Sequence, residues 1–363
     1  MTLFKKSILF LLLIQWSFCS AVYAEEPIPI ESWKILGPFM IAPRDGGIDP
    51  LKKYGGERNI VPSEDQVFHS LYPANGELRW QKLEVDSDQI EVNYDDINWD
   101  SPYERLGSVG LLNLGYAYTE VESEAETMAL VSTRKVPAFL VNGKVFQGEP
   151  YFGNFFKTAV KLHKGKNRIL VKFAGKYKRK FRFQITPTNK KAIFLEDFTK
   201  PDLVPELKQT EFPIALPVLN IQETWLRGAR IVFEEKNGSF HQEFELDPIP
   251  PFGIVKMPLL LKLDEPRKKD LDFRIKLMRE GVLDAADLSL EKKKLEEPHR
   301  ITFHSKIDRS VQYFSVRYPK NYDPEKSYGV IFSLHGAGVE ASHLASQYSS
   351  KDWAFVITPT NRR

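Results

Sequence analysis

The fold of this chain is most constrained by a long succession of short, strand-like segments separated by turn residues. Between residues 27 and 187, segments such as 78–85 alternate apolar and polar side chains, which is the period of a half-buried strand. Asn142-Gly143 directly follows the apolar run 138–141, and this dipeptide strongly indicates a β-hairpin. No segment in this region has a long 3.6-residue period. Residues 25–187 are therefore predicted to form an antiparallel β-sandwich, with strands at 33–39, 78–85, 127–133, 138–141, 155–162, 168–173 and 181–185.

A second, smaller β-sandwich of immunoglobulin type is predicted for residues 188–298. Within this range, residues 188–200 are predicted to form a connector, and residues 201–217 are rich in proline. Further strand-like segments lie at 225–235, 239–246, 253–263, 271–278 and 288–293, with turns at Asn237-Gly238 and Gly281.

Composition agrees with a folded, β-rich protein of more than one domain. The 363 residues exceed the ~100–200 residues of a typical domain. Hydrophobic residues make up 42% of the chain, which excludes a disordered protein, and the 24 Pro and 21 Gly can supply many turns. Because 51 basic residues nearly balance 48 acidic ones, no electrostatic footprint for nucleic acid is visible.

The first 24 residues have the pattern of a cleaved signal peptide. Lys5 and Lys6 precede a short apolar segment, and Val22-Tyr23-Ala24 provides the small residues that signal peptidase accepts. The apolar segment is shorter than the ~20 residues of a spanning helix, and the bulky Phe18 argues against lipidation of Cys19. Cleavage after Ala24 predicts a secreted or periplasmic protein without a membrane anchor.

Cleavage would also change the chemistry of the chain. It removes two lysines, which lowers the formal charge from +3 to +1, and it removes the single cysteine. The mature chain would then have no disulfide, no Cys-ligated metal and no Cys nucleophile.

The first region resembles jelly-roll domains of the galactose-binding-like type. The resemblance is carried by W-x-x-L-G-P-F at 33–39, V-N-G at 141–143 and the segment 160–172, which reads V-x-L-x-x-G-x-N-x-I-L-V-K. Such domains precede the catalytic domains of many secreted hydrolases, and a carbohydrate is the ligand that the resemblance implies. Trp80, Trp99 and Tyr151 could line a sugar platform, although aromatic residues of a sandwich more often belong to its core.

The pattern changes after Pro298. An alternating strand at 310–318 is followed by an apolar run at 328–334, which is typical of a strand covered on both faces. This run ends in His335-Gly336-Ala337-Gly338, and a helix-compatible segment at 340–348 and a second apolar run at 354–358 follow. Strand, glycine loop, helix and strand predict one βαβ unit with parallel strands.

Residues 299–363 resemble the start of an α/β-hydrolase domain, nearest to secreted peptidases of the prolyl oligopeptidase type and related esterases. The matching segments are Y-G-V-I-F-S-L-H-G-A-G and A-F-V-I-T-P-T-N-R. The resemblance implies an oxyanion loop in which Ala337 and Gly338 donate main-chain N–H groups, with His335 and Gly336 as structural members.

The family's catalytic machinery is absent from this sequence. No G-x-S-x-G occurs anywhere, so the nucleophile, acid and base are all missing. We expect this chain alone to be inactive and to be the N-terminal portion of a secreted serine hydrolase that cleaves peptide or ester bonds, or else a truncated product. The alternative is a non-catalytic secreted β-sandwich protein that binds carbohydrate or a protein partner.

The remaining polar residues predict no metal and no cofactor. His299 and His304 are five residues apart, which places them on opposite faces of a strand, and His343 fits a solvated helix position. A group of aspartates could hold Ca²⁺ but lacks EF-hand spacing, so surface turns are the simpler interpretation. These aspartates are Asp86, Asp88, Asp95, Asp96 and Asp100.

Overall fold

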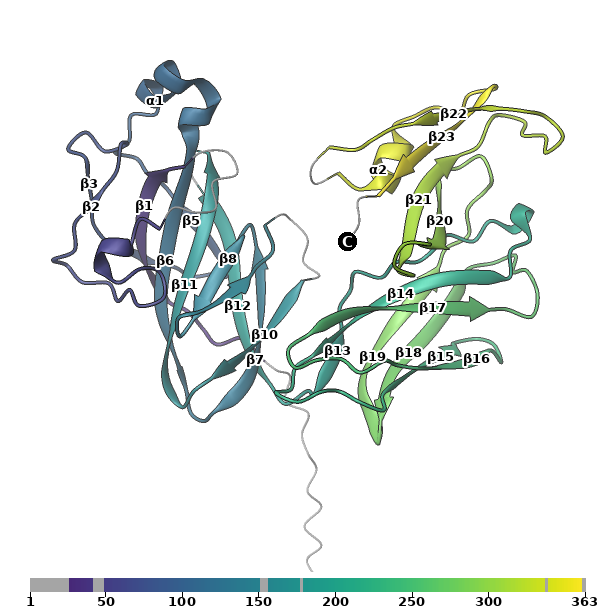
Figure 1. Ribbon diagram of the computed structural model, residues 1–363, viewed down its shortest axis with the longest axis horizontal. Helices are drawn as coiled ribbons and strands as arrows, with labels where there is room; N and C mark the ends of the chain where they lie inside the picture. The colour runs from purple at the N-terminus through teal and green to yellow at the C-terminus, as the bar shows by residue number, and fades with distance from the viewer. Residues whose placement is uncertain (1–25, 42–48, 151–155, 177–178, 337–338, 361–363) are drawn as a thin grey trace, which may run out of the picture.

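The computed structural model describes residues 26–41, 49–150, 156–176, 179–336 and 339–360 (Figure 1). The predicted signal peptide, Tyr151 and the two predicted oxyanion donors Ala337 and Gly338 lie outside these residues, so those predictions stay untested. Across the described ranges, no helix is long and apolar enough to cross a membrane.

The first region is an antiparallel β-sandwich, as the alternation predicted. Its larger sheet has the order β4-β1-β6-β11-β8-β9 and faces a sheet of order β10-β7-β12-β5 (Figure 1). The strands of the larger sheet are β1 Ser32–Met40, β4 Gln81–Glu84, β6 Leu112–Ser123, β8 Ala138–Val141, β9 Lys144–Gln147 and β11 Gly165–Lys176. Those of the smaller sheet are β5 Gln89–Val92, β7 Thr127–Arg134, β10 Lys157–Leu162 and β12 Arg179–Thr188. Aromatic side chains fill the space between the sheets, and Phe173 stacks on Phe181 with ring centroids 5.0 Å apart.

The outer face of the larger sheet is covered by the segment between β1 and β4. This segment contains the short helix η1 Lys52–Tyr54 and the strands β2 Phe68–His69 and β3 Glu77–Leu78. Its apolar side chains form a second core with residues of β1, β6, β8 and β11. The single strand predicted at 78–85 is therefore divided in two, because its first part belongs to the covering segment and its second part to the sheet. Two further short elements, α1 Asp100–Leu106 and η2 Gly107–Leu111, precede β6.

The second region is also a β-sandwich. A sheet of order β13-β14-β17 faces one of order β16-β15-β18-β19, and η3 Pro205–Leu207 precedes β14. The strands are β13 Ala192–Phe194, β14 Glu211–Asn220, β15 Arg230–Glu235, β16 His241–Glu245, β17 Ile254–Lys262, β18 Leu271–Arg279 and β19 Gly281–Leu290.

One sequence expectation in this region was wrong. The proline-rich stretch 201–217 was not expected to form a strand, but it overlaps β14, a central strand. Ala215 exchanges hydrogen bonds with Thr199 on the side away from β17, so Pro213 and Pro217 direct their nitrogens away from β17 as well and remove no bond of that ladder. The turn expected at Gly281 is confirmed, because β18 and β19 form a hairpin in which Arg279 pairs with Gly281 around Glu280.

The last region is a four-stranded sheet of order β20-β21-β23-β22. Its elements are β20 His299–His304, β21 Val311–Arg317, β22 Gly329–Phe332, α2 Ala341–Ser346 and β23 Ala354–Pro359. Strands β22 and β23 are parallel and are connected through α2, which confirms the predicted βαβ unit.

The predicted α/β-hydrolase domain is nevertheless wrong. The described chain is nearly all β, and its two α-helices have only seven and six residues. A parallel α/β sheet has helices on both faces, whereas among the described residues α2 is the only helix of this region. The apolar run at 328–334 was expected to be covered on both faces, but Val330 is 49% and Phe332 is 68% exposed. The structure likewise does not support a protein of the prolyl oligopeptidase type.

Candidate functional site

The aromatic residues singled out in the sequence do not form one platform. Trp99 packs against Tyr72, with ring centroids 5.1 Å apart, next to Tyr94. Trp80 lies instead beside Tyr118 on the outer face of the larger sheet, at 6.4 Å. Of the two predicted platform residues that the structure describes, Trp80 lines one of the two surface hollows described below and Trp99 lines neither.

Trp80 belongs to a hollow of about 520 Å³ on the outer face of strands β4, β1 and β6. We call it the outer groove. Strands β1 and β6 each contribute two side chains spaced by two residues, because alternate side chains of a strand share a face. Strand β4 contributes Lys82, and Trp80 directly precedes this strand. The loop 61–64 forms the wall. The floor residues of the outer groove are Ser32, Lys34, Trp80, Lys82, Tyr118 and Glu120.

The strand register brings these side chains together. Lys34 pairs with Lys82 of β4 on one side and with Tyr118 of β6 on the other. The indole of Trp80 and the ring of Tyr118 meet edge to face, with an interplanar angle of 65°. Tyr118 is buried and Trp80 is partly exposed. The register places the charged side chains of Lys34 and Lys82 beside this aromatic pair.

The wall of the outer groove is tied to its floor by Gln66. The side-chain oxygen of Gln66 accepts a hydrogen bond from Trp80 Nε1 at 2.8 Å and one from the backbone N–H of Ser63 at 3.2 Å. Its amide nitrogen donates to the carbonyl oxygen of Val61 at 3.0 Å. One side chain therefore fixes the indole and two wall residues in place.

The carboxylate of Glu120 is held in its charged form. The hydroxyl of Tyr118 donates to Glu120 Oε1 at 2.8 Å, and Lys166 lies 3.3 Å from the other oxygen. The Tyr118 hydrogen bond is the main reason why the pKa of Glu120 is lowered, and the charges of Lys166 and Lys34 act in the same direction. Burial and the Glu120 contact raise the pKa of Tyr118. The groove thus presents an ionised carboxylate, a phenol and ammonium groups at neutral pH.

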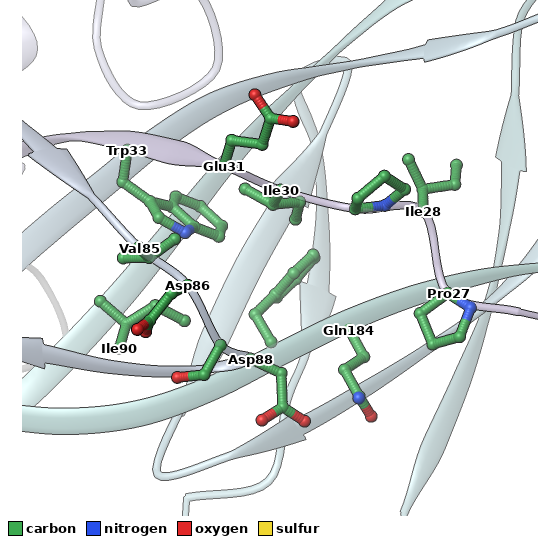
Figure 2. A pocket seen from close by; sticks show the side chains of 13 residues that line it. Pro27, Ile28, Ile30, Glu31, Trp33, Val85, Asp86, Asp88, Ile90 and Gln184 are labelled. Atoms are coloured by element: carbon green, nitrogen blue, oxygen red, sulfur yellow. The ribbon is translucent and has the colours of Figure 1, made fainter.

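A second hollow, of about 290 Å³, lies where the N-terminal segment 27–31 passes the β4–β5 turn (Figure 2). Trp33 forms part of its wall, and Asp86 and Asp88 lie on its lower rim, whereas the carboxylate of Glu31 extends to the opposite side. Asp88 is paired with Arg182 at 3.1 Å. The carboxylates of this hollow therefore do not converge on one point.

The aspartates considered for Ca²⁺ are not gathered. Asp95 and Asp96 are exposed between β5 and α1, and Asp100 begins α1, while Asp86 and Asp88 line the second hollow. Within the described ranges, no group of three His, Cys, Asp or Glu side chains is arranged to hold a metal ion.

The histidines are separated as well. His299 is buried, and its Nδ1 donates to the carbonyl oxygen of Glu297 at 2.9 Å, whereas His304 is exposed at the other end of β20. His343 lies exposed on α2. His335 Nδ1 contacts the carbonyl oxygen of Gly336 at 2.9 Å, but the rest of the predicted oxyanion loop is outside the described residues.

Sequence comparison identifies no relatives: neither a protein-family model nor a curated protein matches this chain. Among solved structures, an exo-chitosanase from Amycolatopsis orientalis, in complex with PNP-β-D-glucosamine, is 10% identical with a TM-score of 0.37; the match covers 79% of this chain and 35% of that protein. A GH2 β-galacturonidase from Eisenbergiella tayi is 10% identical with a TM-score of 0.38, over 86% of this chain and 47% of that protein. A β-glucuronidase from Bifidobacterium dentium is 12% identical with a TM-score of 0.33; the match covers 86% of this chain and 52% of that protein.

This chain spans about a third to a half of the length of those proteins. Structural similarity at these TM-scores is too low to transfer an activity or a ligand. The chemical interpretation of the outer groove therefore depends on its own residues.

Proposed function

We propose that this chain is a carbohydrate-binding β-sandwich protein and that the outer groove holds a sugar. The observation that carries the proposal is the pair Trp80 and Tyr118 on a floor that also presents Lys34, Lys82 and Glu120. A pyranose ring has apolar C–H faces and a polar rim of hydroxyl groups. An aromatic side chain can pack on the face while charged and polar side chains bind the hydroxyl groups.

The size and rigidity of the outer groove support this proposal. Ligand pockets of proteins have volumes of roughly 300–1,000 Å³, and the groove falls within that range at about 520 Å³. The Gln66 hydrogen bonds hold Trp80 and the wall before a ligand arrives. A preformed site lowers the entropy cost of binding.

A protein partner is the less favoured occupant of this surface. Protein interfaces have a dry apolar centre of aromatic and aliphatic side chains. The outer groove is concave, and charged side chains stand at its centre, next to the aromatic pair. This distribution favours a small polyhydroxylated ligand.

The proposal can be tested with Trp80→Ala. Binding to a panel of soluble polysaccharides would be measured by affinity electrophoresis, and tryptophan fluorescence would be followed during titration. We expect at least a tenfold loss of affinity, because a stacking contact of this kind contributes on the order of 1–3 kcal/mol. Trp225→Ala is the matched control, since Trp225 is exposed in the second sandwich and far along the chain from the groove. Equal affinity of the native chain and Trp80→Ala for every bound polysaccharide would contradict the proposal.

A further inference from the structure

We infer that the sugar bound in the outer groove is acidic, with a carboxylate or a sulfate ester that lies between Lys34 and Lys82. This inference rests on the proposed carbohydrate-binding function and adds the chemical class of the ligand. It follows from the positions of the charged side chains on the three strands that form the floor.

The first observation is the register of β1 and β4. Lys34 and Lys82 are directly opposite each other, and both line the outer groove. Directly opposed side chains on neighbouring antiparallel strands have Cβ atoms about 4.5–5.5 Å apart, and like charges in that position destabilise a sheet. Nothing in the packing of the larger sheet requires this pair, because both lysines are exposed on its outer face.

The second observation is how little of this positive charge is compensated. Lys82 is paired with Glu84, but both side chains of that pair are more than half exposed. Lys34 donates to the carbonyl oxygen of Pro62 at 3.5 Å, and within the described ranges no carboxylate lies at ion-pair distance from its ammonium group. An exposed ion pair is weak and exchanges readily with a ligand.

The other acidic groups of the groove do not fill this position. Glu120 accepts the Tyr118 hydrogen bond and is paired with Lys166 of β11, which lies on the side of β6 away from β4. Lys34 also attracts this carboxylate, but from beyond ion-pair distance. Glu64 is on the wall and is exposed. The floor between β1 and β4 therefore presents two ammonium groups to any ligand that enters.

An acidic sugar matches both halves of the floor at once. A ring that packs on Trp80 can direct its anionic substituent toward Lys82, which lies two residues further along the chain in β4, and toward Lys34 opposite it. The hydroxyl groups would then lie toward Glu120 and the wall. Ammonium groups act as point charges and can bind a carboxylate or a sulfate.

The test compares matched ligands that differ only in the anionic group. Hyaluronan would be compared with its carboxyl-reduced form, and dextran sulfate with dextran, which separates a carboxylate source from a sulfate source. We expect the full chain to prefer at least one acidic form by threefold to tenfold, and to lose this preference as salt is raised.

Variants assign the preference to the two lysines. Lys34→Gln combined with Lys82→Gln should remove the preference and retain binding of the neutral form. Lys262→Gln combined with Lys293→Gln removes one exposed and one partly exposed charge from the second region and should leave the preference unchanged, which controls for general attraction of polyanions.

The outcomes distinguish failure of the acidic-sugar inference from failure of the carbohydrate-binding proposal. If neutral and acidic forms bind equally, or if the Lys34 and Lys82 variants keep the preference, the acidic-sugar inference is overturned while the carbohydrate-binding proposal stands. If no neutral or acidic polysaccharide binds, both are overturned. If the control variant loses the preference as strongly, the attraction comes from net charge, and the inference fails.

Discussion

The first sandwich and the C-terminal sheet differ in what lies on the outer face of each. In the first sandwich, the segment 49–80 covers part of the larger sheet (Figure 1). The outer groove lies beside this segment. In the C-terminal sheet, α2 packs on one face, and Phe332 and Val330 lie exposed on the other, in register with Ile357 and Phe355 of β23. Leu334, which follows β22, is 80% exposed.

This difference concerns how the apolar residues on the outer face of each sheet are packed. A sheet is stable when each apolar face is packed against another layer. The covering segment of the first sandwich supplies that layer and, in addition, a wall that leaves room for polar floor residues. The C-terminal sheet has apolar residues without such a layer among the described residues, so its stability must depend on fewer buried contacts.

The largest expected effect is the loss of stability on truncating a buried phenylalanine of the first sandwich, compared with truncating an exposed one of the C-terminal sheet. Phe173 is 1% exposed and stacks on Phe181, so Phe173→Ala should cost about 3–5 kcal/mol of unfolding free energy. Phe332→Ala should change stability by less than about 0.5 kcal/mol, because its side chain is already largely in solvent. Urea unfolding followed by tryptophan fluorescence would measure both.

The Phe332 variant also tests the comparison itself. A cost for Phe332→Ala comparable with that of Phe173→Ala would mean that another layer covers this face in solution. Tryptophan fluorescence can report on the unfolding of both regions, because Trp33 and Trp80 lie in the first sandwich and Trp353 precedes β23.

The sequence predicted the sandwiches better than the last region for a physical reason. Alternation, Asn142-Gly143 and the glycine turns are local features, and they located β7, β8, β11 and β18 to within a few residues. Whether the apolar segment at 328–334 is covered on both faces depends instead on which layers surround it, and these layers lie elsewhere in the chain. A continuous apolar run is compatible with a buried strand or with an uncovered edge strand such as β22.

The candidate site was predictable only in part. Trp80 was singled out, but Lys34, Lys82, Tyr118 and Glu120 were not, because each looks like an ordinary outward-facing residue of its strand. They converge through the order β4-β1-β6, and this order joins segments that are far apart in the chain. In both Trp80-x-Lys82 and Tyr118-x-Glu120, an aromatic residue precedes a charged residue by two positions, and this pattern is the signal that could have marked them.

The next largest effect concerns the attachment of the covering segment to the larger sheet. Glu57 accepts a hydrogen bond from the hydroxyl of Tyr116 at 2.6 Å and lies 2.6 Å from Nζ of Lys172. Both side chains of the ion pair are less than a quarter exposed. Glu57→Ala leaves a buried hydroxyl and an ammonium group without their acceptor and should cost about 1–3 kcal/mol.

Two variants make the Glu57 experiment specific. Glu57→Gln keeps an acceptor for the hydroxyl and should cost less than Glu57→Ala. Glu77→Ala removes an exposed carboxylate of the same segment, and its effect should be small. If thermal melting gives equal losses for Glu57→Ala and Glu77→Ala, the covering segment is not held by this contact.

The smallest expected effect is a pH dependence that arises from a buried histidine of the C-terminal sheet. His299 is 1% exposed, and its ring stacks on Tyr318 with centroids 5.3 Å apart. Because Nδ1 donates to a carbonyl oxygen, the neutral ring carries its proton there, and the buried Nε2 has no hydrogen-bond partner among the described residues. Protonation of Nε2 would bury a charge without an acceptor. Burial accordingly lowers the pKa of His299, although Asp202 and Glu206 oppose this shift.

The sign of the effect follows from the difference in bound protons. In the unfolded chain, His299 takes up a proton as pH falls through about 6.5, whereas the folded chain resists it until a lower pH. The unfolded state therefore binds more protons in this window, so unfolding free energy should decrease as pH is lowered below about 6.5 and reach a constant contribution below the folded pKa. Hydrogen exchange of β20 and β21 between pH 5 and 7, corrected for the intrinsic rate, would measure it, and His299→Gln should remove this part of the slope. His304→Gln is the matched control, because His304 is exposed on the same strand and should leave the slope unchanged. A slope that is the same in the native chain and in His299→Gln would show that His299 does not couple the C-terminal sheet to pH.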